Sequence, residues 1–251
     1  MKSNIHSLCQ CEAISNPIIE SPAFPEEGRN QEIHMEPIRS DIQSGYDKVA
    51  SAYAQAFIDE QAKKPMDHEM LQRFADETHG KGIVCDMGCG PGQVGAWLNE
   101  HCGVKGVIGI DLSPRFIEEA HKLHPQIGFV QGDMLDLEQP DNSWAGVVAF
   151  YSLIHIPHDQ IVDALKEIKR VLKPGGLLLL TFHIGSDIVH VDKFFEQDVS
   201  MDFVMFQPDE MEGYLRLAGY DSLETTVRGP YAPEVEHQSH RAYIFARKPG
   251  E

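Results

Sequence analysis

From residue 80 onward the chain alternates short apolar runs with longer segments in which apolar residues recur every three or four positions. The short runs have the length and hydrophobicity of buried strands, and the longer segments have the period of helices with one apolar face. Strands are predicted at 82–86, 107–111, 127–130, 145–150, 177–181, 220–227 and 242–247. Helices are predicted at 93–101, 114–123, 159–172 and 208–218. This alternation is typical of an α/β, doubly wound, mostly parallel sheet with helices on both faces.

The N-terminal part of the chain has a different pattern. Residues 1–40 show no sustained period and contain several prolines, which predicts a disordered or loosely docked extension. From Asp41, a candidate N-cap, apolar residues return at helical spacing, and a second helix is predicted at 67–77. The predicted organisation is an extension at 1–40, an N-terminal helical cap at 41–79 and a ligand-binding domain at 80–251.

The turn after the first strand carries Asp86 followed by glycines at 88, 90 and 92. Glycine lets the backbone turn tightly and approach a ligand closely. The same stretch contains Gly90-x-Gly92-x-x-Gly95, which satisfies the dinucleotide-binding pattern. The glycines alone therefore leave a nicotinamide or flavin enzyme open.

Acidic residues follow three successive strands. Asp86 would repel a pyrophosphate but suits a ligand with an ammonium or sulfonium group. Asp111 can accept hydrogen bonds from a ribose diol, and Asp133 from an exocyclic amine, with Met134 against a purine face. Each acid alone is equally typical of a solvated strand end. Because the carboxyl ends of parallel strands meet at one edge, the three together outline one crevice.

These motifs resemble those of class I S-adenosylmethionine-dependent methyltransferases. Asp86 with its three glycines is similar to the glycine motif, Asp111 to the ribose acid, 132–134 to the adenine motif and 172–176 to the turn before the fifth strand. The resemblance implies a Rossmann-like seven-stranded sheet whose last strand is antiparallel, and S-adenosyl-L-methionine as the cofactor. Over 46–53 the chain is also similar to bacterial small-molecule methyltransferases of the ubiquinone and menaquinone biosynthesis type.

The resemblance and the positions at strand ends give the candidate site residues. The expected cofactor-binding residues are Asp86, Gly88, Cys89, Gly90, Gly92, Asp111, Leu112, Asp133, Met134 and Phe150. The catalytic candidates are Tyr151, His155 and His183. The substrate-binding candidates are Tyr46, Tyr53, Glu236, His237 and Arg241. Two alternatives stay open, namely a packing role for His155 and a surface turn with a salt bridge around 234–241. His190 and Asp187 could join a metal site, but no tight ligand spacing supports one, so no metal is expected.

Aromatic and Met residues are dense between 194 and 206. They could form an apolar lid over a substrate pocket, or they could be core packing between the fifth strand and the next helix. The helix that carries Tyr46 and Tyr53 is the other candidate lid, since members of the resembled family often close the cofactor site with an N-terminal helix.

Composition narrows the function. The net charge of −18 disfavours nucleic acids and anionic membranes as partners. No apolar run approaches the roughly 20 residues that span a bilayer, no targeting signal is readable, and five cysteines fit free thiols, so a cytoplasmic protein is expected. The predicted function is methylation of a small-molecule acceptor at O, N or C. The alternatives are a cofactor-binding protein with other chemistry or a regulatory role and, more distantly, an NAD-dependent oxidoreductase. The sequence does not fix the oligomeric state.

Overall fold

The computed structural model describes residues 39–58 and 61–250. The extension predicted at 1–40 therefore lies almost entirely outside the described residues. The helices are α1 (Arg39–Phe57), η1 (Gln61–Lys63), α2 (Pro65–Thr78), α3 (Gln93–Glu100), α4 (Pro114–Leu123), η2 (Leu153–His155), α5 (Ile161–Val171) and α6 (Pro208–Leu217). The strands are β1 (Val84–Met87), β2 (Val107–Asp111), β3 (Gly128–Gln131), β4 (Trp144–Phe150), β5 (Leu172–His183), β6 (Ile188–Phe194), β7 (Gln197–Val204), β8 (Asp221–Arg228) and β9 (Arg241–Arg247).

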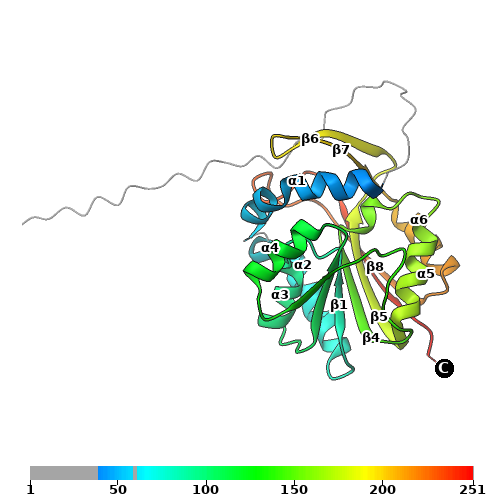
Figure 1. The fold of residues 1–251 in the computed structure, drawn as a ribbon. Helices are drawn as coiled ribbons and strands as arrows, with labels where there is room; N and C mark the ends of the chain where they lie inside the picture. Colours follow the sequence, from blue (N-terminus) through cyan, green and yellow to red (C-terminus); the bar gives the residue numbers. More distant parts are fainter. Residues whose placement is uncertain (1–38, 59–60, 251) are drawn as a thin grey trace, which may run out of the picture.

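Seven strands form one sheet in the order β3-β2-β1-β4-β5-β9-β8 (Figure 1). The pairs among the first five strands of this order are parallel, and β9 runs antiparallel to both β5 and β8. The predicted fold class is confirmed, including the antiparallel last strand. Because the order reverses between β1 and β4, the turns after these two strands diverge and leave a crevice, where open α/β sheets bind ligands.

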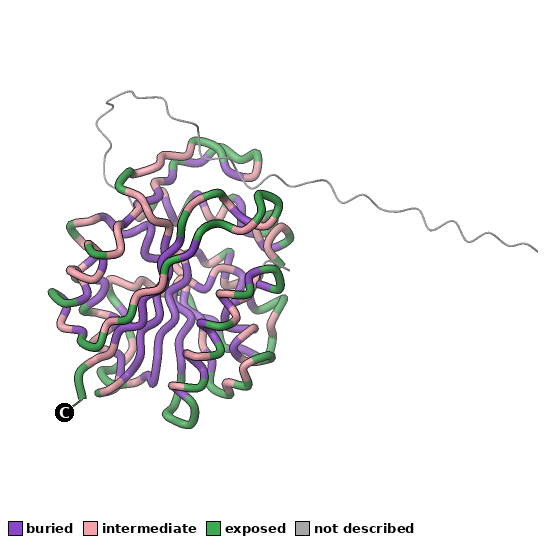
Figure 2. Tube along the Cα trace, turned by 180° about the vertical axis from the view of Figure 1, so that it is seen from behind, coloured by how far each residue is buried: buried purple, intermediate pink, exposed green. Residues whose placement is uncertain are grey.

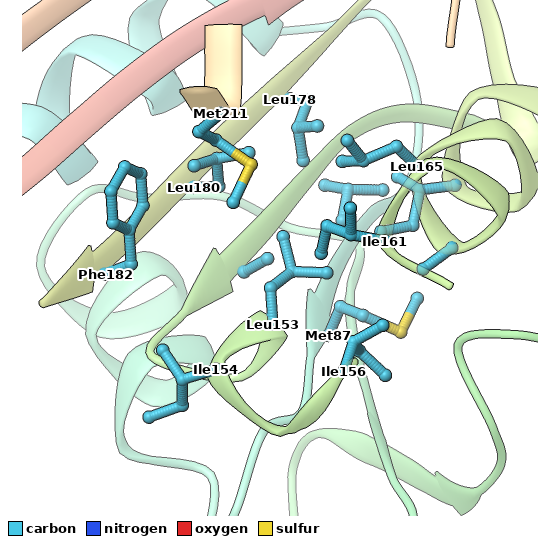
Figure 3. Close-up of a cluster of buried hydrophobic side chains, with 14 of the residues drawn as sticks. Met87, Leu153, Ile154, Ile156, Ile161, Leu165, Leu178, Leu180, Phe182 and Met211 are labelled. Atoms are coloured by element: carbon cyan, nitrogen blue, oxygen red, sulfur yellow. The ribbon is translucent and has the colours of Figure 1, made fainter. Parts of the chain in front are cut away.

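Two hydrophobic layers cover the faces of the sheet. Side chains alternate along β4 and β5, so that Val147 and Leu178 pack under α5 and α6 while Val148 and Leu177 pack under α2 and α3. Figure 3 shows the α5 and α6 side of this core, where Ile161, Leu165 and Met211 meet the strands. In Figure 2 the central strands form a continuous buried centre, and the exposed positions lie on the surrounding helices and loops and on the outer strands. Of the segment expected as a cap, α1 lies over the crevice and α2 packs on the sheet.

Several predicted boundaries are wrong. α1 begins at Arg39, so Asp41 lies within its first turn and is not an N-cap. The predicted helix 159–172 begins at Ile161 and ends at Val171. The strand predicted at 177–181 begins at Leu172, because the segment before Leu177 already pairs with β4 through Trp144 and Leu172. None of the helices in the two described ranges has the length and apolar character needed to cross a membrane.

The aromatic segment between 194 and 206 forms most of an antiparallel hairpin, β6–β7, that the hydrophobic pattern did not predict. Its turn places Phe195 and Glu196 at φ values of 48° and 59°, a backbone region that normally favours glycine or asparagine. The hairpin packs on α1, and its side chains Phe194, Met201 and Phe203 are buried. The segment therefore combines the two expected roles: its apolar side chains are packed in the core, and the hairpin that it forms packs on α1, which lies over the crevice.

Candidate functional site

One pocket opens at the carboxyl edge of the sheet. Side chains from α1, from the turns after β1, β2 and β3, and from the segment after β4 line it. Most of the predicted site residues meet there, namely Tyr46, Tyr53, Asp86, Gly88, Cys89, Gly90, Asp111, Leu112, Asp133, Met134, Phe150, Tyr151 and His155. The topology explains this convergence, because each of these groups belongs to α1 or lies at or after the end of a strand that faces the same edge.

The glycine turn needs its glycines for two different reasons. Gly88 has a φ of +68°, and a Cβ there would lie 2.2 Å from the Cβ of Ser152. Gly90 has a φ of +52°, but a Cβ there would meet no atom within 4 Å, so its backbone is open toward a ligand. Gly92 has a φ of +90°, and a Cβ there would collide with the ring of Phe129, so the glycine lets the turn pack closely on that ring. Gly92 does not line the pocket, although it was expected to bind the cofactor.

Asp111 holds the turn and the pocket together. Its Oδ2 accepts from the backbone N–H of Gly90 and its Oδ1 from that of Ser113, each at 2.8 Å. Each carboxylate oxygen still has a second lone pair that can accept a hydroxyl. Burial raises the pKa of Asp111 to about 6, against the lowering effect of these backbone hydrogen bonds.

Asp86 is the most buried acid in the pocket. It is 2% exposed, and its Oδ2 accepts from the backbone N–H of Gly95, in the first turn of α3, at 2.8 Å. Burial raises its pKa to about 7, the Gly95 hydrogen bond opposes this shift, and the charge of Asp111 adds to it. A cationic ligand would favour the ionised form of both acids.

Asp133 faces Arg39, a residue that the sequence analysis did not single out. The two side chains form an ion pair, and Asp133 Oδ1 also accepts from the backbone N–H of Leu135 at 2.9 Å. Arg39 is the first residue of α1, so this ion pair ties the start of α1 to the turn after β3.

Four buried side-chain atoms of pocket-lining residues have no hydrogen-bond partner, namely Gln61 Oε1, Gln93 Oε1, Tyr151 Oη and Ser152 Oγ. Buried polar atoms are costly unless water or a ligand pairs with them. Together with the open backbone at Gly90 and the three acids, these atoms fit a polar ligand that carries hydroxyls, amines and a positive charge. These polar groups suit S-adenosylmethionine.

Tyr46 and His155, which are 109 residues apart, form a hydrogen bond of 2.7 Å between the phenol oxygen and Nε2. His155 Nδ1 lies 3.0 Å from the backbone oxygen of Asp202 in β7. Burial lowers the pKa of His155 to about 4, which keeps its ring neutral. His155 is therefore packed in the interior, as the alternative proposed, and it also lines the pocket.

The remaining candidates do not line the pocket. His183 lies behind Tyr151, with ring centroids 5.0 Å apart, and its Nδ1 is 2.6 Å from Ser239 Oγ. Burial, followed by the charge of Arg241, keeps the pKa of His183 well below its usual range, so it is held neutral. His237 accepts a hydrogen bond from Arg241 through its backbone oxygen.

The positions of Glu236 and Arg241 contradict the expectation of a substrate-binding set at the pocket mouth, because neither residue lines the pocket. Both are buried, and the Glu236 carboxylate accepts from Arg228 at 2.5 and 3.0 Å and lies 3.2 Å from Arg241 Nε. Arg228 also approaches Asp67, which accepts from the Tyr243 hydroxyl. This buried ion cluster joins α2 to β8 and β9. The rest of the turn is exposed or half-buried, so the alternative of a surface turn with a salt bridge fits better, although the bridge itself is buried.

Sequence reasoning missed Arg39, Gln61, Lys64, Gln93 and Ser152, which all line the pocket. Gln93 begins the helix after the glycine turn, and Ser152 follows the fourth strand, so both positions carried a usable signal. Gln61 and Lys64 lie in and beside the single turn η1, which has no periodic pattern. Arg39 lies just before the first apolar repeat.

Comparison with known proteins agrees with this geometry. Residues 84–176 match the family model described as methyltransferase domain. Over 96 residues the chain is 41% identical to demethylmenaquinone methyltransferase of Staphylococcus carnosus, covering 37% of this chain and 39% of that protein. Over 164 residues it is 28% identical to a sterol 24-C-methyltransferase of Gibberella zeae, covering 58% and 42%. The chain thus spans about two fifths of the length of these relatives.

Solved structures share the fold at low sequence identity. The Burkholderia thailandensis 1,6-didemethyltoxoflavin-N1-methyltransferase, with its substrate and S-adenosylhomocysteine bound, is 20% identical with a TM-score of 0.62 over 84% of this chain and 88% of that chain. The [4+2]-cyclase SpnF is also 20% identical with a TM-score of 0.62, over 86% and 98%. The chain therefore matches a methyltransferase domain over residues 84–176 and shares the overall fold of S-adenosylmethionine-dependent methyltransferases.

Proposed function

We propose that this protein transfers the methyl group of S-adenosylmethionine to a small-molecule acceptor at O, N or C. The observation that carries the proposal is the convergence of Asp86, Asp111 and Asp133 with the glycine turn in one pocket. A scaffold protein has no need to bury acids of raised pKa around an open glycine backbone. The family match over 84–176 supports the same conclusion.

Each element of the pocket has a proposed task. Asp111 accepts from the ribose hydroxyls, Asp133 from the adenine amine, and Asp86 favours the positively charged methionyl end. The bound cofactor supplies an activated methyl group on a sulfonium, a good leaving group. The protein then contributes alignment and exclusion of water, and proximity alone is worth roughly 7–11 kcal/mol in well-oriented reactions. α1 and the β6–β7 hairpin exclude water from above the site.

A second candidate function is other chemistry, or regulation, on the same cofactor-binding fold. This candidate is supported by the similarity of the fold to that of SpnF, which is a [4+2]-cyclase. An NAD-dependent oxidoreductase is the more distant alternative, because Asp86 places a carboxylate where a pyrophosphate would need neutral or positive groups. The net charge of −18 supports a partner other than nucleic acid, and free Cys85, Cys89 and Cys102 support the proposed cytoplasmic location.

Calorimetric titration with S-adenosylmethionine, S-adenosylhomocysteine and NAD tests the proposal. We expect both adenosyl ligands to bind and NAD to give no heat of binding. Binding of NAD alone would select the oxidoreductase, and absence of binding by both adenosyl ligands would contradict the proposed function. Tight binding without methyl transfer to any acceptor would favour the second candidate.

A further inference from the structure

Two uncharged side chains that can exchange a proton face the pocket from elements far apart in the chain. Tyr46 of α1 and His155 of η2 both line the pocket and share the hydrogen bond of 2.7 Å. We propose that this pair takes the proton of the methyl acceptor, and that the acceptor therefore carries an O–H group at the atom that is methylated. This inference rests on the proposed function and narrows its substrate class.

The second ring nitrogen of His155 fixes the direction of the hydrogen bond. His155 Nδ1 lies 3.0 Å from the backbone oxygen of Asp202, which can only accept. Nδ1 therefore carries the proton, and Nε2 offers its lone pair to the Tyr46 hydroxyl, which donates. The oxygen of Tyr46 keeps lone pairs that can accept from a ligand in the pocket.

The surroundings hold the pair in position. The Tyr46 ring packs on Phe116, with centroids 5.2 Å apart, and the His155 ring packs on Phe203, at 4.8 Å. Since Tyr46 belongs to α1 and Asp202 to β7, the pair is complete only while helix and hairpin are docked on the sheet. A proton acceptor assembled from three separate elements is available only in a closed pocket.

Burial keeps the resting pair uncharged. It lowers the pKa of His155 to about 4 and raises the pKa of Tyr46 above its usual value. A hydroxyl that attacked without losing its proton would become an oxonium, which is a far stronger acid than an imidazolium. Even a weakly basic histidine therefore accepts the proton as the new bond forms, and it releases that proton readily afterwards.

The proposed step balances. The lone pair of the acceptor atom forms the new bond to the methyl carbon, and the electron pair of the broken carbon–sulfur bond stays on sulfur. The acceptor's proton passes to the Tyr46 oxygen while the Tyr46 proton passes to His155 Nε2. The products are the methylated acceptor, a neutral thioether and an imidazolium whose Nδ1–H is bonded to the Asp202 carbonyl.

The first test needs no acceptor. Nitrogen-15 NMR of the histidine rings, recorded with and without S-adenosylhomocysteine and assigned with His155→Gln, reports which nitrogen of His155 carries the proton. We expect a neutral ring with the proton on Nδ1 at neutral pH. A proton on Nε2 would overturn the inference, because that nitrogen could not accept another. If S-adenosylhomocysteine itself fails to bind, the proposed function fails instead.

The second test measures the rate of methyl transfer to catechol. Tyr46→Phe keeps the ring packing but breaks the relay, and we expect it to slow transfer by about 10²–10⁴-fold while the affinity for S-adenosylhomocysteine changes by less than about tenfold. Tyr214→Phe, which removes a hydroxyl bonded to Glu210 on α6 outside the pocket, is the matched control and should leave the rate unchanged. Equal rates in Tyr46→Phe and wild type, or products methylated only at carbon, would overturn the inference.

Discussion

The hydroxyl of Ser113 donates to the carboxylate of Asp47 at 2.5 Å, which joins α1 to the start of α4. Ser113 also accepts from the backbone N–H of Phe116 as the N-cap of α4, and its own N–H donates to Asp111. One serine therefore connects the helix over the pocket with the acid proposed to hold the ribose. Docking of α1 and preorganisation of Asp111 are coupled through this contact.

We expect Asp47→Ala to weaken this coupling. Hydrogen bonds to charged groups contribute about 1.5–3 kcal/mol, so the variant should lose about 1–2 kcal/mol of unfolding free energy and bind S-adenosylhomocysteine up to about tenfold more weakly. Urea unfolding and calorimetry measure the two effects. Asp41→Ala, in the same helix but outside the pocket, is the control. Unchanged affinity in Asp47→Ala would mean that α1 docks independently of α4.

Affinity for the cofactor product should depend on pH in a defined direction. The pKa values of Asp111, about 6, and Asp86, about 7, are raised in the ligand-free protein, so lowering the pH protonates both acids. A ligand that binds the ionised forms loses affinity as they protonate, and we expect S-adenosylhomocysteine to bind at least about tenfold more weakly at about pH 5 than at about pH 7.5. Asp111→Asn should flatten this profile. A flat profile in wild type would contradict the proposed roles of these acids.

The mostly parallel sheet and the meeting of the acids were predictable from sequence. Both follow from general rules of parallel sheets, namely continuous apolar strands and carboxyl ends that share one edge. The β6–β7 hairpin was not predictable, because its turn residues, Phe195 and Glu196, carry no turn signal and the glycine or asparagine expected at positive φ is absent. The long start of β5 was missed because a Pro-Gly-Gly turn normally ends an element.

The geometry of the turn after β1 predicts that its glycines differ in how much an alanine substitution lowers the free energy of unfolding. A Cβ on Gly88 would collide with the Cβ of Ser152 and would also meet an unfavourable φ, whereas a Cβ on Gly90 would meet only the φ penalty. We expect Gly88→Ala to cost about 2–5 kcal/mol of unfolding free energy and Gly90→Ala about 1–2 kcal/mol. Thermal or urea unfolding checks the difference. Ser152→Gly should recover part of the loss in Gly88→Ala and none of the loss in Gly90→Ala.

Glu236 should matter for folding and not for ligand binding. Its carboxylate accepts from Arg228 and from the backbone N–H of Tyr231, and it faces Arg241. Breaking a buried ion pair costs about 3–5 kcal/mol, so Glu236→Ala should unfold at much lower urea concentration. The exposed Glu234→Ala is the matched control. The folded fraction of Glu236→Ala should keep wild-type affinity for S-adenosylhomocysteine, and a selective loss of affinity would revive its role as a binding residue.

Candidate residues near the last strands were predicted less well than those near the glycine turn. Strand ends fix which edge a residue belongs to but not which way its side chain points. Glu236 and Arg241 therefore looked like a binding set, although Glu236 pairs with both Arg228 and Arg241 inside the protein. The Tyr46–His155 contact was equally out of reach, because no sequence pattern links a helix of the cap to a turn 109 residues later.

The most direct test of the central claim is a crystal structure of the protein with S-adenosylhomocysteine. We predict the ribose hydroxyls within about 2.5–3.0 Å of the Asp111 carboxylate oxygens. We also predict the adenine amine beside Asp133 and the amino acid end of the ligand beside Gly88 and Ser152. A nucleoside bound away from the three acids, or bound with a phosphate-like group against the glycine turn, would contradict this account.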